Sequence, residues 1–365
     1  MLRAMPTVQV DLGERSYEVL VENGLLARVG EAIAKTGLKG RAAIISDDTV
    51  ARHHGQALHA SLEAAGLEPS LHLVPAGEAS KSMSRVEELC SSLAAAGHDR
   101  RSLVVALGGG VVGDLAGFVA AVFYRGVPFV QVPTTIVAQV DSSVGGKTGV
   151  NLAEGKNLLG AFHQPKLVIV DPAVLATLPA RDYHEGFAEV IKHAAIRDAA
   201  MLPEIARLDP STREVPADLI ARNIAIKARI VEADEHETKG IRALLNFGHT
   251  IGHGIEAAVP YGEMLHGEAI SLGLRAALLL SEKHAGLSPD SSRTILALLT
   301  RFQLPLLLDP AITTERVLHK LGRDKKFEAG KVRFVLLRAP GDAYVSEAVT
   351  TADMEEAIEH LRTPL

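Results

Sequence analysis

Tryptophan, a second cysteine and long apolar runs are all missing from this chain of 365 residues. Its single cysteine, Cys90, cannot form a disulfide within the chain, which is typical of a reducing cytoplasm. No apolar run is long enough to span a bilayer, and Asp11, Glu14 and Arg15 interrupt the amino terminus where a secretory signal would be apolar. These absences predict a cytoplasmic protein with no membrane partner.

An excess of basic residues is missing as well. The chain has 38 Lys and Arg against 44 Asp and Glu, a formal net charge of −6. Nucleic-acid binders normally present a broad basic face, so we expect no nucleic-acid partner, and an anionic ligand would have to bind in a local pocket. The length exceeds that of one hydrophobic core and predicts two domains.

The hydrophobic pattern changes near residue 180. Before it, short apolar runs alternate with helical patterns, and the runs lack the alternation of half-buried strands. This predicts a Rossmann-like α/β domain with a parallel sheet over residues 1–180, preceded by a hairpin at 7–24. The strand candidates lie at 41–47, 71–77, 102–110, 128–135 and 166–171.

After the change, apolar residues recur at helical spacing. This predicts a mostly α-helical domain over residues 181–365, interrupted by a small hairpin at 331–346 that turns at Pro340, Gly341 and Asp342. The helix candidates lie at 181–198, 217–237, 267–286 and 352–363.

A glycine-rich turn follows the strand candidate at 102–110. Gly108, Gly110 and Gly113 have the spacing G-x-G-x-x-G between a strand and a helix expected to open near Gly113. Amides and the helix dipole at such a turn attract a pyrophosphate. The acidic residue that normally follows about 20 positions onward is missing. Asp47 and Asp48 end another strand and could meet a ribose instead; the alternative is a turn that only packs a helix on a strand.

A second polar stretch spans residues 133–162. Gly146, Lys147 and Thr148 resemble a nucleoside triphosphatase loop, but that pattern requires glycine at position 141, where the chain has Asp141. We interpret the stretch as a long functional loop for an anionic, hydroxylated ligand, the alternative being a solvated connector. Its candidate ligand-binding residues are Asp141, Lys147, Asn151, Lys156 and Asn157.

Three histidines and a carboxylate predict a metal site. His249 and His253 share one helical face, and His266 follows downstream. Glu189 and Lys192 also share a helix face, and apolar neighbours indicate that Glu189 is at least partly buried, where it needs a cation or a metal. Two of the histidines with one carboxylate would make a catalytic site, although any single histidine could be structural.

Three further observations concern the residues of the helical half. Arg242 and Asn246 precede His249 at helical spacing and should point near it. The metalloprotease version of the histidine motif needs a glutamate at position 250, where the chain has Thr250, so that function is excluded. Lys325 and Lys326 by themselves are only a charge run on a solvated face.

These residues fall in six ordered stretches that together resemble 3-dehydroquinate synthases, members of the sugar-phosphate cyclase superfamily that act in the shikimate pathway of aromatic amino acid biosynthesis. The resemblance covers essentially the whole chain. The stretches read GGGVVGDLAGFVAA, PTTIVAQVDSSVGGKTGVN, GKNLLGAFHQP, LPARDYHEGFAEVIKH, LLNFGHTIGHGIE and LHGEAI.

The resemblance implies a redox-neutral lyase reaction. The family oxidises C5 of 3-deoxy-D-arabino-heptulosonate 7-phosphate with bound NAD, eliminates phosphate, reduces C5 again, opens the ring and closes the carbocycle by aldol addition. A divalent metal, zinc or cobalt, acts as Lewis acid on the C5 oxygen. The substrate phosphate removes its own C6 proton, so the enzyme mainly holds the reactants in place. The resemblance also implies a homodimer.

The resemblance also implies a role for each matching residue. The metal ligands are Glu189, His249 and His266. The reacting hydroxyls lie by Asp141 and Lys192, and the substrate carboxylate is bound by Lys227 and Arg242. The substrate phosphate is surrounded by Lys147, Asn157, Asn246, His253 and Lys326, with Arg125 reaching a neighbouring subunit's site. NAD is bound by Asp47, Glu78, Lys81, Gly110, Val111, Val112, Gly113, Asp114, Thr134, Thr135, Lys147, Lys156 and Thr177.

Three competing hypotheses remain. A sibling sugar-phosphate cyclase would act on another sugar phosphate, but Arg242 gains nothing from a substrate without a carboxylate. A metal-dependent alcohol dehydrogenase of the glycerol dehydrogenase type would consume NAD stoichiometrically and should not need so many phosphate-directed lysines. A nucleotide-sensing module without catalysis would not need Glu189, His249 and His266 together.

Overall fold

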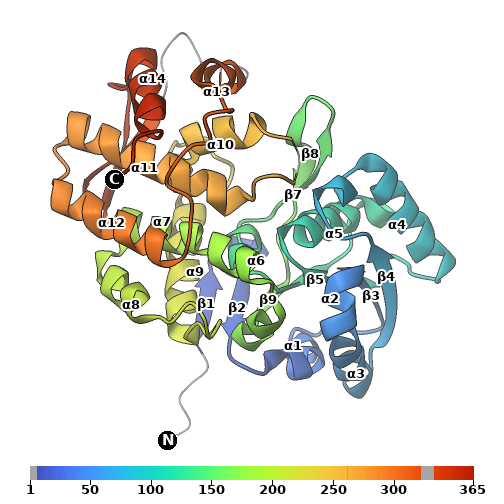
Figure 1. Ribbon diagram of the computed structural model, residues 1–365. Helices are drawn as coiled ribbons and strands as arrows, with labels where there is room; N and C mark the ends of the chain where they lie inside the picture. The colour runs from blue at the N-terminus through green and yellow to red at the C-terminus, as the bar shows by residue number, and fades with distance from the viewer. Residues whose placement is uncertain (1–5, 261, 322–332) are drawn as a thin grey trace, which may run out of the picture. The chain divides into compact units, whose positions relative to one another are not determined.

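The computed structural model describes residues 6–260, 262–321 and 333–365 (Figure 1). The chain forms two compact units. The first consists of Met1–Pro179 and Arg213–Glu232, and the second of Ala180–Thr212 and Ala233–Leu365. The chain therefore enters the second unit after residue 179, returns to the first unit for residues 213–232, and ends in the second unit.

A seven-stranded sheet forms the centre of the first unit. Its strand order is β1-β2-β9-β6-β5-β3-β4, and every neighbouring pair is parallel except the predicted amino-terminal hairpin β1–β2. All five strand candidates are confirmed. The strands are β1 (Thr7–Val10), β2 (Tyr17–Val21), β3 (Arg41–Asp47), β4 (Glu68–Val74), β5 (Leu103–Gly108), β6 (Phe129–Pro133) and β9 (Leu167–Val170).

Helices cover both faces of this sheet, which is why its central strands are apolar throughout. Ile44 of β3 belongs to a core cluster with residues of α1 (Val29–Lys35) and α3 (Gln56–Ala64). Its neighbour Ile45 belongs to a second cluster with residues of α4 (Met83–Ala95) and α5 (Gly110–Val122). Successive side chains of a strand point to opposite faces, so two covered faces remove the polar alternation from the sequence.

The strand order reverses beside β3. Taken in chain order, the parallel strands β3, β4, β5, β6 and β9 are arranged 2-1-3-4-5, with β3 between β4 and β5. In open sheets of this kind, ligands bind outside the carboxyl ends of the two strands at the reversal. The last registered pair of β3 and β5 is Ser46 with Leu107, so Asp47 and Gly108 lie at that point.

The long loop expected within residues 133–162 is in part a hairpin, and that prediction was wrong. β7 (Lys147–Leu152) pairs antiparallel with β8 (Gly155–Phe162). Gly149 faces Gly160, where a Cβ atom on Gly160 would lie 2.0 Å from the carbonyl oxygen of Thr148. Glycine is required for this close approach, and it conceals the strand pattern because glycine has no β propensity.

The first unit also contains a long helix from the second half of the chain. Residues Arg213–Glu232 include most of α9 (Ala217–Ala233), a helix predicted from its apolar spacing. Short helical segments complete the unit. They are α2 (Asp48–Val50), the 3-10 helices η1 (Gly13–Arg15), η2 (Leu25–Arg28), η4 (Glu78–Ser80), η5 (Phe123–Arg125) and η7 (Pro172–Thr177), and the π-helices η3 (Ala51–Gly55) and η6 (Ala138–Ser142).

The second unit is mostly helical, as predicted, and contains the predicted hairpin of β10 and β11. Among the described residues of the whole chain, none of the helices combines the length and apolar character that a membrane span requires. The helices of the unit are α6 (Ala180–Glu185), α7 (Phe187–Arg197), η8 (Ala199–Met201), α8 (Leu202–Arg207), η9 (Arg242–Asn246), α10 (His249–Ala257), α11 (His266–Ala285), α12 (Pro289–Arg301), α13 (Thr314–Leu321) and α14 (Thr351–His360). The strands are β10 (Phe334–Ala339) and β11 (Asp342–Ser346).

Helices α10 and α11 pack with their backbones in close approach. A Cβ atom on Gly273 of α11 would lie 1.9 Å from the carbonyl oxygen of Gly248, and one on Gly252 would lie 3.1 Å from the carbonyl oxygen of Ala269. These neighbours are backbone atoms, which cannot rotate away. The two helices that carry the histidines therefore depend on glycine for their separation.

We expect Gly273→Ala to destabilise the protein by about 1–3 kcal/mol, because the added methyl group overpacks the contact between α10 and α11. The melting temperature should fall, by about 2–4 °C for each kcal/mol in a unit of this size, as measured by calorimetry. Gly55→Ala is a matched control, because its Cβ atom would meet only Ala51 Cβ at 3.5 Å. Equal melting temperatures for the two variants would contradict the packing argument.

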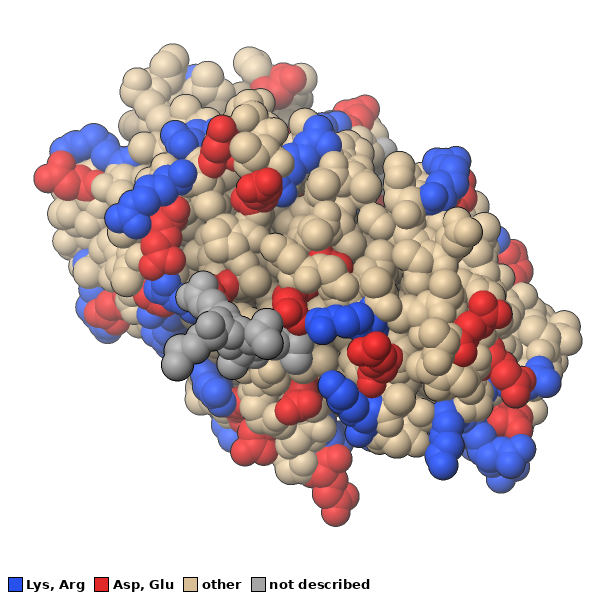
Figure 2. Space-filling model, turned by 90° about the horizontal axis from the view of Figure 1, so that it is seen from below, with Lys and Arg blue, Asp and Glu red and all other residues tan. Residues whose placement is uncertain are grey.

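Positive and negative side chains alternate on the face of the molecule drawn in Figure 2. Lys and Arg there lie beside Asp and Glu, with uncharged residues between them. A surface of this kind has no extended field of one sign, so it does not attract a polyanion over a large area.

Candidate active site

The glycine turn lies at the strand reversal of the first unit. α5 begins at Gly110, three residues before the predicted start, and its first backbone hydrogen bond runs from the amide of Gly113 to the carbonyl oxygen of Gly109. The amides that open a helix have no acceptor within it and carry its positive dipole end. Gly110, Val111 and Val112 therefore present donors suited to a phosphate.

Two of the three motif glycines are also needed for packing. A Cβ atom on Gly108 would lie 2.6 Å from Val112 Cβ, and one on Gly113 would lie 2.6 Å from Gln131 Oε1. The packing alternative is thus correct for these two positions. It does not exclude a ligand, because the third glycine of a dinucleotide-binding turn has the same packing role.

A polar cluster gathers around Lys81, which is 4% exposed. Its ammonium group lies 2.7 Å from Asp114 Oδ2 and donates to Asn157 Oδ1. Burial raises the pKa of Asp114, and Lys81 opposes that rise. Asn151 donates to Glu78 Oε1 at 2.8 Å. The structure thus brings residues expected at NAD (Glu78, Lys81, Asp114) together with Asn157, which was expected at the substrate phosphate.

The other predicted NAD residues of the first unit have local partners. Asp47 caps α2, and its Oδ1 accepts from the amides of Thr49 and Val50 at 2.9 and 2.8 Å. Sequence reasoning missed this capping role, which the Asp-x-x spacing allows. The amide of Thr134 donates to Gly108 at 3.0 Å, which ties the glycine turn to β6. The hydroxyl of Thr134 is buried without a hydrogen bond among the described residues.

The remaining members of that set take part in local structure. Thr135 Oγ1 accepts from the amide of Ala138 at 3.1 Å, and Thr177 Oγ1 lies 2.9 Å from His54 Nε2. Lys156 is exposed on β8.

The predicted substrate residues of the first unit differ in their surroundings. Lys227 on α9 lies 2.9 Å from Asp141 Oδ1 and also donates to the Asp141 carbonyl oxygen at 2.5 Å. Lys147 is exposed on β7. Arg125 is exposed in a turn where Tyr124 and Arg125 both have positive φ, 49° and 66°. Left-handed backbone at consecutive non-glycine residues is costly, and strained residues of this kind cluster at functional sites.

Glu189 is the centre of the site in the second unit. It lies fully buried on α7, which confirms the burial inferred from its apolar neighbours. Oε2 contacts the ammonium group of Lys192, and Oε1 lies 3.2 Å from His249 Nε2 and 3.6 Å from His266 Nε2. Burial opposes ionisation, but Lys192 and the imidazoles outweigh it and hold the pKa of Glu189 well below its usual range.

The two imidazoles nearest Glu189 are oriented by acceptors on their far sides. His249 Nδ1 lies 3.1 Å from the Phe247 carbonyl oxygen, and His266 Nδ1 lies 3.3 Å from Glu256 Oε2. A hydrogen bond from Nδ1 leaves the Nε2 lone pair available to a metal, the usual arrangement of metal-binding histidines. Both Nε2 atoms point at the same Glu189 oxygen.

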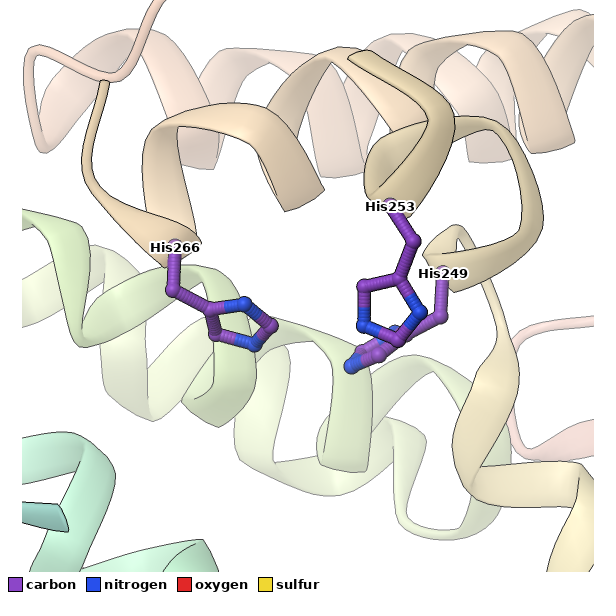
Figure 3. Close-up of side chains that lie close together, drawn as sticks. All are labelled: His249, His253 and His266. Carbon is purple, nitrogen blue, oxygen red and sulfur yellow. The ribbon is translucent and has the colours of Figure 1, made fainter. Parts of the chain in front are cut away.

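His253 lies beside this pair. Figure 3 shows the three imidazoles converging, His249 and His253 from α10 and His266 from the start of α11. The ring of His253 is 5.1 Å from that of His249 and 5.8 Å from that of His266, centre to centre. One nitrogen from each of the three lies within 4.8 Å of the others. Proximity alone thus allows all three as ligands.

The pKa values of His249 and His266 shift in opposite directions, although burial lowers both. Burial lowers the pKa of His249, and the neighbouring Lys192 charge lowers it further. Burial also disfavours the charged form of His266, but hydrogen bonds with Glu189 and Glu256 outweigh it and raise that pKa to about 10. Glu256 was missed from the sequence. Its position three residues after His253 was the available signal, because that spacing places it on the histidine face of α10.

Arg242 and Asn246 are not on the same helix as His249, so the continuous helix assumed for their spacing was wrong. They lie on η9, which Phe247 and Gly248 separate from α10. Gly248 has φ +78°, and this left-handed residue breaks the helical spacing. Arg242 is 4% exposed and donates from Nη1 to the Glu235 carbonyl oxygen at 2.8 Å. Lys325 and Lys326 lie outside the described residues.

The chain is similar to proteins of known function over almost its full length. It matches the family models described as 3-dehydroquinate synthase N-terminal, over residues 71–185, and 3-dehydroquinate synthase C-terminal, over 186–327. It is 45% identical to the 3-dehydroquinate synthase of Pelobacter propionicus, over 93% of this chain and 96% of that protein.

Solved structures agree with this result. ValA, a 2-epi-5-epi-valiolone synthase from Streptomyces hygroscopicus with NAD⁺ and Zn²⁺ bound, superposes with a TM-score of 0.86 at 32% identity, covering 96% of this chain and 98% of that one. A 2-deoxy-scyllo-inosose synthase with carbaglucose-6-phosphate, NAD⁺ and Co²⁺ superposes with a TM-score of 0.87 at 25% identity, covering 96% and 99%.

The parallel α/β unit and the helical unit are those of the sugar-phosphate cyclase class. Within that class, the two family models and the full-length relatives decide the assignment. The chain belongs to the 3-dehydroquinate synthase family.

Proposed function

We propose that the chain converts 3-deoxy-D-arabino-heptulosonate 7-phosphate into 3-dehydroquinate and phosphate, as a carbon–oxygen lyase that uses NAD and a divalent metal. The observation that carries the proposal is the buried Glu189 carboxylate with two imidazole Nε2 atoms directed at it, in a chain whose relatives share that function. Metal and cofactor are inferred from this donor set and from their presence in the related cyclases.

The residues around Glu189 fit a metal ion. Both carboxylate oxygens are buried, and their polar neighbours among the described residues are the Lys192 ammonium group and the Nε2 atoms of His249 and His266. A buried carboxylate is costly unless cations surround it, and a metal ion held by Glu189, His249 and His266 would add to the compensation that Lys192 supplies. Nitrogen and oxygen donors suit zinc and cobalt. When bound, the metal would act as a Lewis acid on the C5 oxygen of the substrate.

We prefer a ligand set of one carboxylate and two histidines (Glu189, His249 and His266) over a set of three histidines. His249 and His266 both have Nδ1 engaged and Nε2 directed at one Glu189 oxygen. The carboxylate would also neutralise one charge of a divalent ion. His253, beside them, is assigned instead to the substrate phosphate.

NAD would bind at the strand reversal of the first unit. The opening amides of α5 would take the pyrophosphate, and the cluster of Glu78, Lys81 and Asp114 would hold the rest of the cofactor in place. When bound, NAD would accept the C5 hydride and later return it. The full proposed set is Asp47, Glu78, Lys81, Gly110, Val111, Val112, Gly113, Asp114, Thr134, Thr135, Lys147, Lys156 and Thr177.

The substrate would be held by charges matched to its own. Arg242 and Lys227 would bind the carboxylate, and Lys192 and Asp141 would contact the reacting hydroxyls. Correct placement is the main requirement, because the substrate phosphate removes the C6 proton itself. The phosphate would be bound by Lys147, Asn157, Asn246, His253 and Lys326, with Arg125 supplied by the second subunit of a homodimer.

An assay of the purified protein tests the function. We expect phosphate release from the heptulosonate phosphate with NAD⁺ in catalytic amounts and no net NADH, and chelation of the metal should stop it. Steady NADH formation on a simple polyol, without phosphate release, would instead favour a dehydrogenase. Turnover of a sugar phosphate that lacks a carboxylate, but not of the heptulosonate, would favour a sibling cyclase.

Glu256→Gln should weaken metal binding by about 10–100-fold, because the neutral amide no longer orients His266 or increases its basicity. The metal affinity is measured by competition with a chromogenic chelator, without turnover. Glu347→Gln, an exposed carboxylate of the same unit, is the control and should bind metal like the wild type. An unchanged metal affinity in Glu256→Gln would contradict this role.

A further inference from the structure

Asp234 organises the loop that leads to Arg242. The residue follows α9 directly, and its side chain is buried at 2% exposure. Its Oδ1 accepts from the amides of Thr238 and Lys239 at 2.8 and 3.0 Å. Its Oδ2 accepts from the amides of Ile241 and Arg242 at 3.0 and 3.2 Å. One carboxylate therefore binds four backbone donors across residues 238–242.

The charge of Asp234 does not stabilise α9. A negative charge just after a helix opposes the helix dipole, and a buried carboxylate is costly unless donors surround it. Burial raises the pKa of Asp234, but the four amides outweigh it and hold that pKa below its usual value. The carboxylate is thus ionised at neutral pH. Its stabilising effect falls on the loop whose amides it binds.

The loop ends at a side chain that the proposed function uses. Within residues 234–242, Glu237 and Gly240 have positive φ, 59° and 77°, so the backbone needs support to keep this shape. The buried Arg242 receives that support directly through its amide. Its guanidinium donates to the Glu235 carbonyl oxygen and lies 3.4 Å from Glu237 Oε1, both within the same loop.

We propose that Asp234 is a positioning residue for the substrate carboxylate, acting through Arg242. By holding four amides it fixes the loop shape, and with it the direction of the guanidinium that meets the carboxylate of the sugar acid. The inference rests on the proposed function and assigns to that function a residue that does not contact the substrate.

Asp234→Asn tests this role, because an amide side chain keeps the size of the carboxylate but only one of its two oxygens. Two of the four backbone donors then face an NH₂ group. We expect KM for the heptulosonate phosphate to rise about 10–100-fold, the scale of an ångström displacement of a binding group. The turnover number at saturation, the bound metal and the affinity for NAD⁺ should stay within about twofold of wild type.

Two comparisons separate positioning from stability. Asp353→Asn removes another buried carboxylate of the second unit, one that accepts from the amide of Thr350 at 2.8 Å and pairs with Lys283 at 2.8 Å. It should lower the melting temperature and leave KM unchanged. Arg242→Lys should raise KM, and adding Asp234→Asn to it should raise KM little further, because both changes affect one interaction.

The outcomes are distinct. A raised KM in Asp234→Asn, little further increase in the double variant and an unchanged KM in Asp353→Asn support the proposal. An unchanged KM in Asp234→Asn, fully additive effects, or parallel losses of kcat and bound metal overturn it. A wild-type protein that releases no phosphate from the heptulosonate phosphate contradicts the proposed function itself, and the role of Asp234 falls with it.

Discussion

Replacing Glu189 with glutamine is expected to remove the bound metal and to lower kcat by at least about 10³-fold, since a Lewis-acid metal supplies several kcal/mol and each 1.36 kcal/mol is tenfold. The variant keeps the shape of the side chain and loses its charge. His249 and His266 alone would be left as ligands, and Lys192, which contacts the carboxylate, would repel a divalent cation without its counter-charge.

Metal content per chain, measured by mass spectrometry after dialysis, checks this expectation independently of turnover. Glu356→Gln is the control, because its carboxylate is 69% exposed and pairs with Lys283 on the surface of α14. It should hold metal and turn over like the wild type. A Glu189→Gln protein with full metal content would show that the carboxylate is not a ligand.

The second prediction distinguishes the roles of two neighbouring histidines. His266→Ala should lose the metal and with it the activity, whereas His253→Ala should keep the metal and lose activity by about 10²-fold, because a misplaced phosphate slows a reaction that depends on orientation. The reason is the geometry around Glu189. His266 has Nε2 directed at the carboxylate and Nδ1 held by Glu256.

The contrast between the variants is the informative result. His319→Ala, an exposed histidine of the same unit, controls for the general effect of removing an imidazole and should retain both metal and activity. If His253→Ala emptied the metal site while His266→Ala did not, the ligand set would be wrong. The three histidines would then have to be reconsidered, since their nitrogens all lie within 4.8 Å.

Much of the fold could be predicted because burial leaves a clear pattern in the sequence. Strands covered on both faces are apolar throughout, so β3, β5, β6 and β9 were recognisable. β7 and β8 were not, because Gly149 and Gly160 interrupt their pattern to let the two backbones approach. Glycine in a sequence usually indicates a flexible segment, whereas here it allows two strand backbones to lie in close contact.

Helix boundaries were less predictable than helix existence. The start of α5 at Gly110, rather than near Gly113, depends on a backbone hydrogen bond to Gly109. The break before α10 depends on Gly248, whose carbonyl oxygen lies against Gly273 of α11, far along the chain. A contact between distant glycines has no signature in local spacing.

The sequence by itself determined the chemistry available to this protein: a glycine turn at a strand end, a buried glutamate and a cluster of histidines, in an order that resembles one family. The tertiary structure decided which groups cooperate. It directs two histidine Nε2 atoms at Glu189, sets Glu256 behind His266, and gives Asp234 four amides. These contacts depend on which side-chain atoms of different helices and loops lie close together. Spacing along the chain indicates only which residues could share a face.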